Sequence, residues 1–140
     1  MPSDENELRQ KLEALQRRDE VQRSAITSYG IDLGKRRVID LSFWAPDEQS
    51  ATRLSEAWQR NEGGVPVVLP PVDGTRSRWL VGVTLTASVD FITTKENAAT
   101  FLLFADKYDC EYDGWVQRSS RLHKERTRAQ PSSNPNWSTD

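Results

Sequence analysis

The chain has 140 residues, of which 36% are hydrophobic and 29% charged, and its formal net charge at pH 7 is −2. This length suffices for one domain with its own core, and the single cysteine, Cys110, excludes an internal disulfide. No apolar run follows Met1, so we expect neither a signal peptide nor a membrane span and assign the chain to the cytoplasm.

Charge is unevenly distributed along the chain. Residues 30–117 carry nine Lys/Arg against thirteen Asp/Glu, whereas residues 118–130 carry five against one. An acidic domain is a poor electrostatic match for nucleic acid, because phosphate neutralisation supplies most non-specific affinity. The distribution therefore favours a basic protein partner and argues against direct nucleic-acid binding.

The first predicted element is a helix over residues 1–29, separate from the domain that follows. Leu8, Leu12 and Leu15 recur at helical spacing within a charged segment that lacks glycine and has proline only at its second residue. Gly30 follows at the position where glycine commonly ends a helix.

Residues 30–117 are predicted to form one domain in which strand and helix signals alternate. Strands are expected over residues 38–45, 65–69, 78–89 and 111–116, and helices near residues 47–62 and 93–109. Pro66 places the second strand at a sheet edge, and Thr93 with Glu96 forms a capping box. The order β-α-β-β-α-β predicts an α+β fold of ferredoxin-like topology, a four-stranded antiparallel sheet with two helices on one face, plus the N-terminal helix.

The other face of this sheet is predicted to stay open. It should present Asp40, Ser42 and Trp44 from the first strand, and Thr84 and Thr86 from the third. Residues 118–140 lack apolar periodicity, so we predict a disordered basic tail there.

The most informative stretch is Glu111-Tyr112-Asp113-Gly114-Trp115, which follows the last predicted helix. Simple alternation places Glu111, Asp113 and Trp115 on one face of a strand, with Tyr112 and Gly114 on the other. A glycine inside a strand often marks a bulge or a close backbone approach. Gly114 is therefore expected to have a positional role.

This motif, with the apolar helix of residues 101–108 before it, resembles the C-terminal signature of the RraB family, the protein regulators of ribonuclease E activity. The likeness in layout extends over about residues 36–117. It implies a cytoplasmic, non-catalytic protein of ferredoxin-like topology that binds a large ribonuclease and restrains it. It also implies that the five motif residues take part in partner binding.

Catalytic groups lack the neighbours that they need. His123, the only histidine, has no carboxylate or thiol at ligand spacing. Cys110 has no adjacent lysine or histidine in the sequence that would lower the pKa of its thiol. Asp109, Glu111 and Asp113 could share a strand face and hold a hard cation, although a solvated face or a partner-binding patch is commoner. We expect no enzyme activity, no cofactor and no metal.

Two functions stay open on the sequence alone. The first is a non-catalytic protein-binding regulator of an RNA-degrading enzyme, similar to the ribonuclease E inhibitors that the motif resembles, which would use Asp40, Trp44 and the motif residues 111–115; whether it inhibits is left open. The second is a single-stranded RNA-binding module that uses the open sheet face and the basic tail. The third strand lacks the paired aromatic residues of such modules, which favours the regulator. The sequence leaves the oligomeric state open.

Overall fold

The computed structural model describes residues 4–74 and 76–117. The predicted basic tail, residues 118–140, lies outside this range. Eight elements follow in chain order: α1 (Glu5–Ser28), β1 (Arg37–Ala45), α2 (Glu48–Glu62), β2 (Val67–Leu69), β3 (Trp79–Ala87), α3 (Val89–Ile92), α4 (Lys95–Lys107) and β4 (Glu111–Gln117).

The strands form one open antiparallel sheet in the order β2-β3-β1-β4. β1 and β3 pair along their whole length, from Arg37 opposite Ala87 to Ala45 opposite Trp79. The predicted α+β architecture, a four-stranded antiparallel sheet with an N-terminal helix, is confirmed. Pro66 precedes β2, which does lie at a sheet edge but is shorter than predicted because pairing begins only at Val67.

The core lies between the sheet and its helices. Ile39, Leu41 and Phe43 of β1 are fully buried on one face. The Phe43 ring contacts Trp58 of α2 at 6.5 Å and Phe104 of α4 at 5.9 Å between ring centroids, which places both helices on that face. Burial of these large side chains supplies most of the stabilisation.

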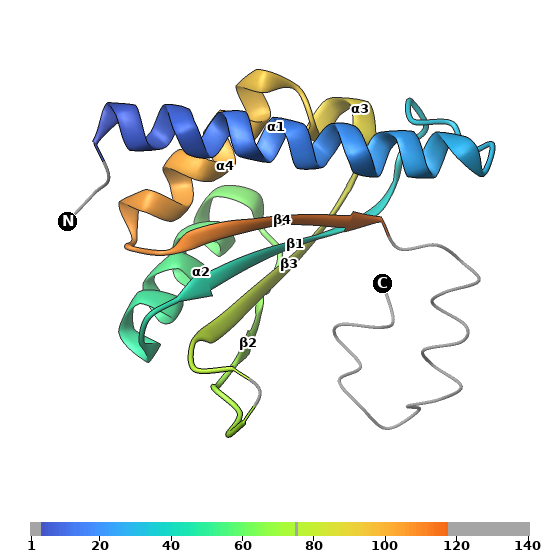
Figure 1. Cartoon of the computed structure of the whole chain (residues 1–140). Coiled ribbons are helices and arrows are strands. Elements are labelled where there is room, and N and C mark those ends of the chain that lie inside the picture. The colour runs from blue at the N-terminus through green and yellow to red at the C-terminus, as the bar shows by residue number, and fades with distance from the viewer. Residues whose placement is uncertain (1–3, 75, 118–140) are drawn as a thin grey trace.

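α1 is an integral part of this packing. It lies alongside α4 and along the β4 edge of the sheet (Figure 1). Leu15 of α1 is 5% exposed within the common core, and Leu12 and Ile26 pack against it. The helix predicted as a separate segment thus shares its core with the sheet.

Helix starts are set by side-chain caps. Asp4 and Asp47 accept hydrogen bonds from the amides of Glu7 and Ser50, and the left-handed Gly63 ends α2 at Glu62, the predicted last residue of this helix.

The β3–α4 connection differs from the sequence-based expectation. β3 ends at Ala87 because Ser88 caps the short helix α3 by accepting a hydrogen bond from the Phe91 amide. The predicted capping box is wrong by one residue: Thr94 caps α4, whereas the Thr93 hydroxyl donates to the Val89 carbonyl.

Candidate functional site

The family-like motif begins after a tight helix end. The Asp109 amide donates to the Asp106 carbonyl and the Cys110 amide to the Ala105 carbonyl, the hydrogen-bond pattern of a Schellman motif. Asp109 takes the left-handed position that this motif requires, with φ of 60°. The turn delivers the chain directly into β4, so the acidic residues on both sides of the turn come close together.

A bulge in β4 reverses the predicted alternation of side chains. Ser42 pairs with Gly114, but the next β1 residue, Phe43, pairs with Tyr112, which leaves Asp113 as the extra residue. Gly114 adopts φ of 103°, which L side chains rarely adopt. As a result, Tyr112 and Trp115 both face the core.

Trp115 of β4 forms a hydrogen bond that connects α1 to the sheet. Its indole Nε1 donates a 2.7 Å hydrogen bond to Asp19 Oδ1 in the buried interface. From α1, Arg18 donates to the Asp113 carbonyl at 2.9 Å and Gln22 donates to the Trp115 carbonyl at 3.0 Å. The side chains of α1 therefore occupy backbone acceptors of the edge strand.

Burial raises the pKa of the Asp19 carboxyl, while the Trp115 hydrogen bond and the nearby Arg18 and Arg23 act in the opposite direction. Burial likewise raises the pKa of the Tyr112 phenol, whose ring contacts Phe43 and Phe101 at 5.3 Å. Both groups belong to the core.

These positions correct the predicted surface. Tyr112, Gly114 and Trp115 are buried, and Trp115 does not share a face with the acids. Asp113 is half-buried next to Arg18, with 4.0 Å between its Oδ1 and Arg18 Nη1. Glu111 is exposed. Within the motif, the exposed Glu111 and the half-buried Asp113 are therefore the acidic residues that solvent reaches.

The open sheet face brings Trp44 and Glu111 together. They are paired residues on β1 and β4, and the Arg78 guanidinium lies 5.0 Å from the centre of the Trp44 ring. Arg78 Nη1 is also 3.3 Å from Glu111 Oε2. Asp40 lies farther along this face, where it is 5% exposed and accepts a 2.8 Å hydrogen bond from Thr84. Asp40 is thus engaged within the sheet and separate from the Trp44–Glu111 pair.

A depression of about 520 Å³ lies beside this pair, and we call it the acidic hollow. Four carboxylates and two cationic side chains line it, so its formal charge is negative. Its lining comes from α1, the end of β1, the start of α2, the residue before β3, and the end of α4 with the turn into β4: Lys11, Trp44, Pro46, Asp47, Ser50, Arg78, Asp106, Asp109, Cys110 and Glu111.

Sequence reasoning placed only Trp44 and Glu111 of this lining in the site. Asp47 has a sequence signal as the cap of α2, and Asp106 and Asp109 flank the end of α4. Arg78 had no such signal, because its place beside Glu111 depends on pairing between strands that are distant in sequence.

Cys110 is buried and lines the hollow. Burial, with Asp109 and Asp47 nearby, raises the pKa of its thiol to about 12. A thiol with this pKa stays protonated at neutral pH and is a poor nucleophile. Among residues 4–74 and 76–117, no group of His, Cys, Asp and Glu side chains has the arrangement of a metal site.

The comparisons with known proteins fit a regulator. None of the helices in the described part of the chain is long and apolar enough to span a membrane. The comparison with curated proteins gives no match. The family model for regulator of ribonuclease activity B matches residues 18–116, from the Arg18 contact in α1 to β4. This match covers well over half of the sequence and agrees with the resemblance of the motif. The chain therefore belongs to the RraB family of regulators of ribonuclease activity.

Proposed function

We propose that this chain is a non-catalytic cytoplasmic regulator that binds an RNA-degrading enzyme, and restrains it, through the acidic hollow. The observation that carries the proposal is that four carboxylates and the partly exposed Trp44 line one hollow, which also includes Glu111, the first residue of the family motif. Tryptophan is common among the residues that dominate binding energy at protein interfaces. A basic segment of the ribonuclease would match the charge of the hollow.

Charge complementarity should act mainly on the rate of association. Opposite charges steer the encounter of two proteins and choose between partners, and salt screens this steering. In the free protein, Arg78 covers the Trp44 ring and pairs with Glu111. A competing cation of the partner could take the place of the Arg78 guanidinium on either group.

The open face gives less support to RNA binding. Trp44 is the aromatic residue among the described β1 and β3 positions of that face; it pairs with Leu80, and the further β3 positions there are Gly82, Thr84 and Thr86. RNA-recognition sheets stack bases on two or three aromatic side chains. Protein binding is therefore the better use of this surface.

Substitutions of opposite effect test the proposal. Nuclease-treated lysate from the source cell would be passed over the purified chain, and a captured ribonuclease would then be purified for kinetics. Glu111→Gln should slow association, whereas Arg78→Gln makes the hollow more acidic and should accelerate it. Glu56→Gln, at an exposed α2 position outside the hollow, is the matched control.

The protein should stay folded in all three variants, because exposed charges contribute little to stability. Equal association rates for the Glu111 and Arg78 variants would refute binding through the acidic hollow. Capture of RNA without a ribonuclease would instead favour the RNA-binding alternative.

A further inference from the structure

The opposite edge of the sheet contains an unpaired strand segment. β1 pairs with all of β3, but β2 pairs only with its residues Leu80 to Gly82. Beyond Gly82, no strand of the described residues pairs with the outer edge of β3 up to Ala87. The exposed Arg36 side chain donates to the Thr86 carbonyl in this stretch. An unpaired edge of this kind is a template for an added strand.

Two hollows follow this unpaired edge. The first, of about 400 Å³, lies where β2 begins, between residues 64–67 and residues 82–84 of β3. The second, of about 540 Å³, continues past Leu85 and is lined by aromatic rings that include Phe91, Phe101 and Phe104. Trp58 lines both hollows and so joins them along the strand.

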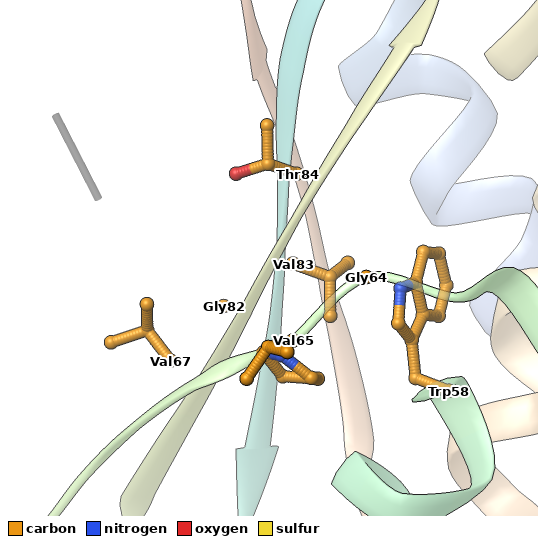
Figure 2. Close-up of a pocket in the computed structure, with 8 residues that line it drawn as sticks. Trp58, Gly64, Val65, Val67, Gly82, Val83 and Thr84 are labelled. Atoms are coloured by element: carbon orange, nitrogen blue, oxygen red, sulfur yellow. The ribbon is translucent and has the colours of Figure 1, made fainter. Parts of the chain in front are cut away.

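Trp58 places an indole N–H group at this junction. The residue is 5% exposed, and Figure 2 shows its indole nitrogen turned toward β3 and the Gly64–Val67 segment. An indole N–H group that lines a hollow can donate a hydrogen bond to an acceptor that enters it. The site is therefore suited to receive a carbonyl oxygen.

We propose that the outer edge of β3 from Val83 to Ala87 binds an extended peptide segment of another protein by strand addition. The unpaired backbone requires an extended main chain, and the aromatic hollow requires an apolar side chain, preferably aromatic. Side chains alternate between the two faces of an added strand, so one of them would enter the aromatic hollow between α2, α3 and α4.

The charge of this surface separates it from the acidic hollow. Glu62 is the charged residue among those that line the two edge hollows. Binding there should depend on backbone hydrogen bonds and apolar contact, and it should depend only weakly on salt. The two surfaces also lie at different edges, because the strand order places β2 and β4 at opposite sides of the sheet.

The test uses the full-length chain and a phage-displayed library of random peptides selected at high salt. The best selected peptide is synthesised and titrated into isotopically labelled protein. We expect amide shifts at Val83–Ala87, a shift of the Trp58 indole N–H signal, and an aromatic residue in the selected consensus. Methylation of alternate peptide nitrogens should abolish binding in one register and spare it in the other.

Two protein variants complete the experiment. Phe91 is 56% exposed, so Phe91→Ser should leave the fold intact while it weakens the peptide at least about tenfold. Trp58→Phe keeps a ring but removes the indole N–H and should weaken binding. Because Trp58 packs against Phe43 in the core, this variant should also melt at a lower temperature, so its affinity is measured well below that transition. Glu111→Lys is the control and should bind the peptide as the unchanged protein does.

Several results would overturn the proposal. These are failure to select any peptide, signal changes centred on β4, and equal effects of the two methylation registers. Self-association that disappears in Phe91→Ser would show that a second copy of the chain occupies this edge.

Discussion

At the scale of single residues, the motif acts mainly from inside the molecule. Trp115 and Tyr112 fill the core, and Asp19 accepts the Trp115 indole hydrogen bond. Their identity and spacing were evident in the sequence, but their orientation was not. An extra residue in a strand shifts every later side chain to the other face. In β4 the extra residue is Asp113, which forms the bulge.

The Asp19–Trp115 pair predicts a pH dependence of stability. Because the native pKa of Asp19 is raised above the ordinary value of 3.8, the native state binds this proton more tightly than the unfolded chain does. The contribution of Asp19 to stability is therefore greatest below pH 3.8 and declines as pH rises through the native pKa. Asp19→Asn should remove this decline while it still accepts the indole hydrogen bond.

Urea unfolding at several pH values measures the effect. The free energy of unfolding of Asp19→Asn, relative to the unchanged protein, should increase from about pH 3.5 toward neutrality. Asp19→Leu leaves the indole donor unpaired and should lose about 1–3 kcal/mol throughout this range. A difference between Asn and Asp that stays constant with pH would contradict the raised pKa.

Asp109 predicts a stabilising substitution in the acidic hollow. The left-handed position costs an L residue conformational energy, although Asp tolerates it better than most. Asp109→Gly should raise the free energy of unfolding by about 0.5–1 kcal/mol, and Asp109→Ala should lower it. Both changes remove a carboxylate from the hollow, so both should weaken ribonuclease binding. A less stable glycine variant would mean that the contacts of the Asp109 carboxylate outweigh its backbone strain.

At the scale of elements, local signals were sufficient where one residue decides the conformation. Asp47 and Gly63 define α2 correctly because a cap and a left-handed glycine act within a few residues. β3 was predicted too long because Ser88 can either continue a strand or cap a helix. Ser88 caps a helix here because the Phe91 amide donates to its hydroxyl and because Ile92 is buried in the core. The alternation of residues in a strand reports neither interaction.

The two sides of the sheet differ in what covers their outermost backbone, which belongs to β4 on one side and, beyond the short β2, to β3 on the other. On β4, Arg18 and Gln22 from α1 bind backbone carbonyls, which leaves that edge less able to pair with another chain. On β3, the segment after Gly82 has no strand paired to its outer side in the described part of the chain, and Arg36 donates to its Thr86 carbonyl. Sequence alone could not separate the edges, because cover by α1 depends on tertiary packing.

The bulge in β4 predicts an intolerant glycine. Gly114 has φ of 103°, and an added Cβ would lie 3.2 Å from Arg18 Nη2, the mobile end of a long side chain. Backbone strain should therefore dominate, and Gly114→Ala should lower the free energy of unfolding by about 1–3 kcal/mol.

A double-mutant cycle with Arg18→Ala separates the two causes of this loss. If strain dominates, the loss from Gly114→Ala should be nearly the same with or without Arg18. Full recovery in the double variant would instead assign the effect to contact with the guanidinium.

At the scale of the whole molecule, the fold was largely accessible from sequence but the site was not. Alternating apolar residues in β1 and β3 specify a sheet with one buried face, so the architecture follows from periodicity. The acidic hollow instead combines Lys11, Arg78 and Asp106 from separate elements. Their proximity depends on strand register and helix packing, which periodicity does not report.

The shared core predicts that α1 and the sheet unfold together. Leu15 of α1 lies in the same buried cluster as Leu41 and Trp115, so loss of the α1 contacts should destabilise the whole unit. Leu15→Ala should lower the free energy of unfolding by about 2–4 kcal/mol. In both proteins, tryptophan fluorescence and far-ultraviolet circular dichroism should follow one coincident urea transition.

Glu13→Ala, an exposed position on the same helix, is the control and should change stability little. If α1 were an independent segment, Leu15→Ala would instead produce an early loss of helical signal while tryptophan fluorescence stayed native. That result is not expected, since the indole of Trp115 is bonded to α1 through Asp19 and reports on the joint between the helix and the sheet.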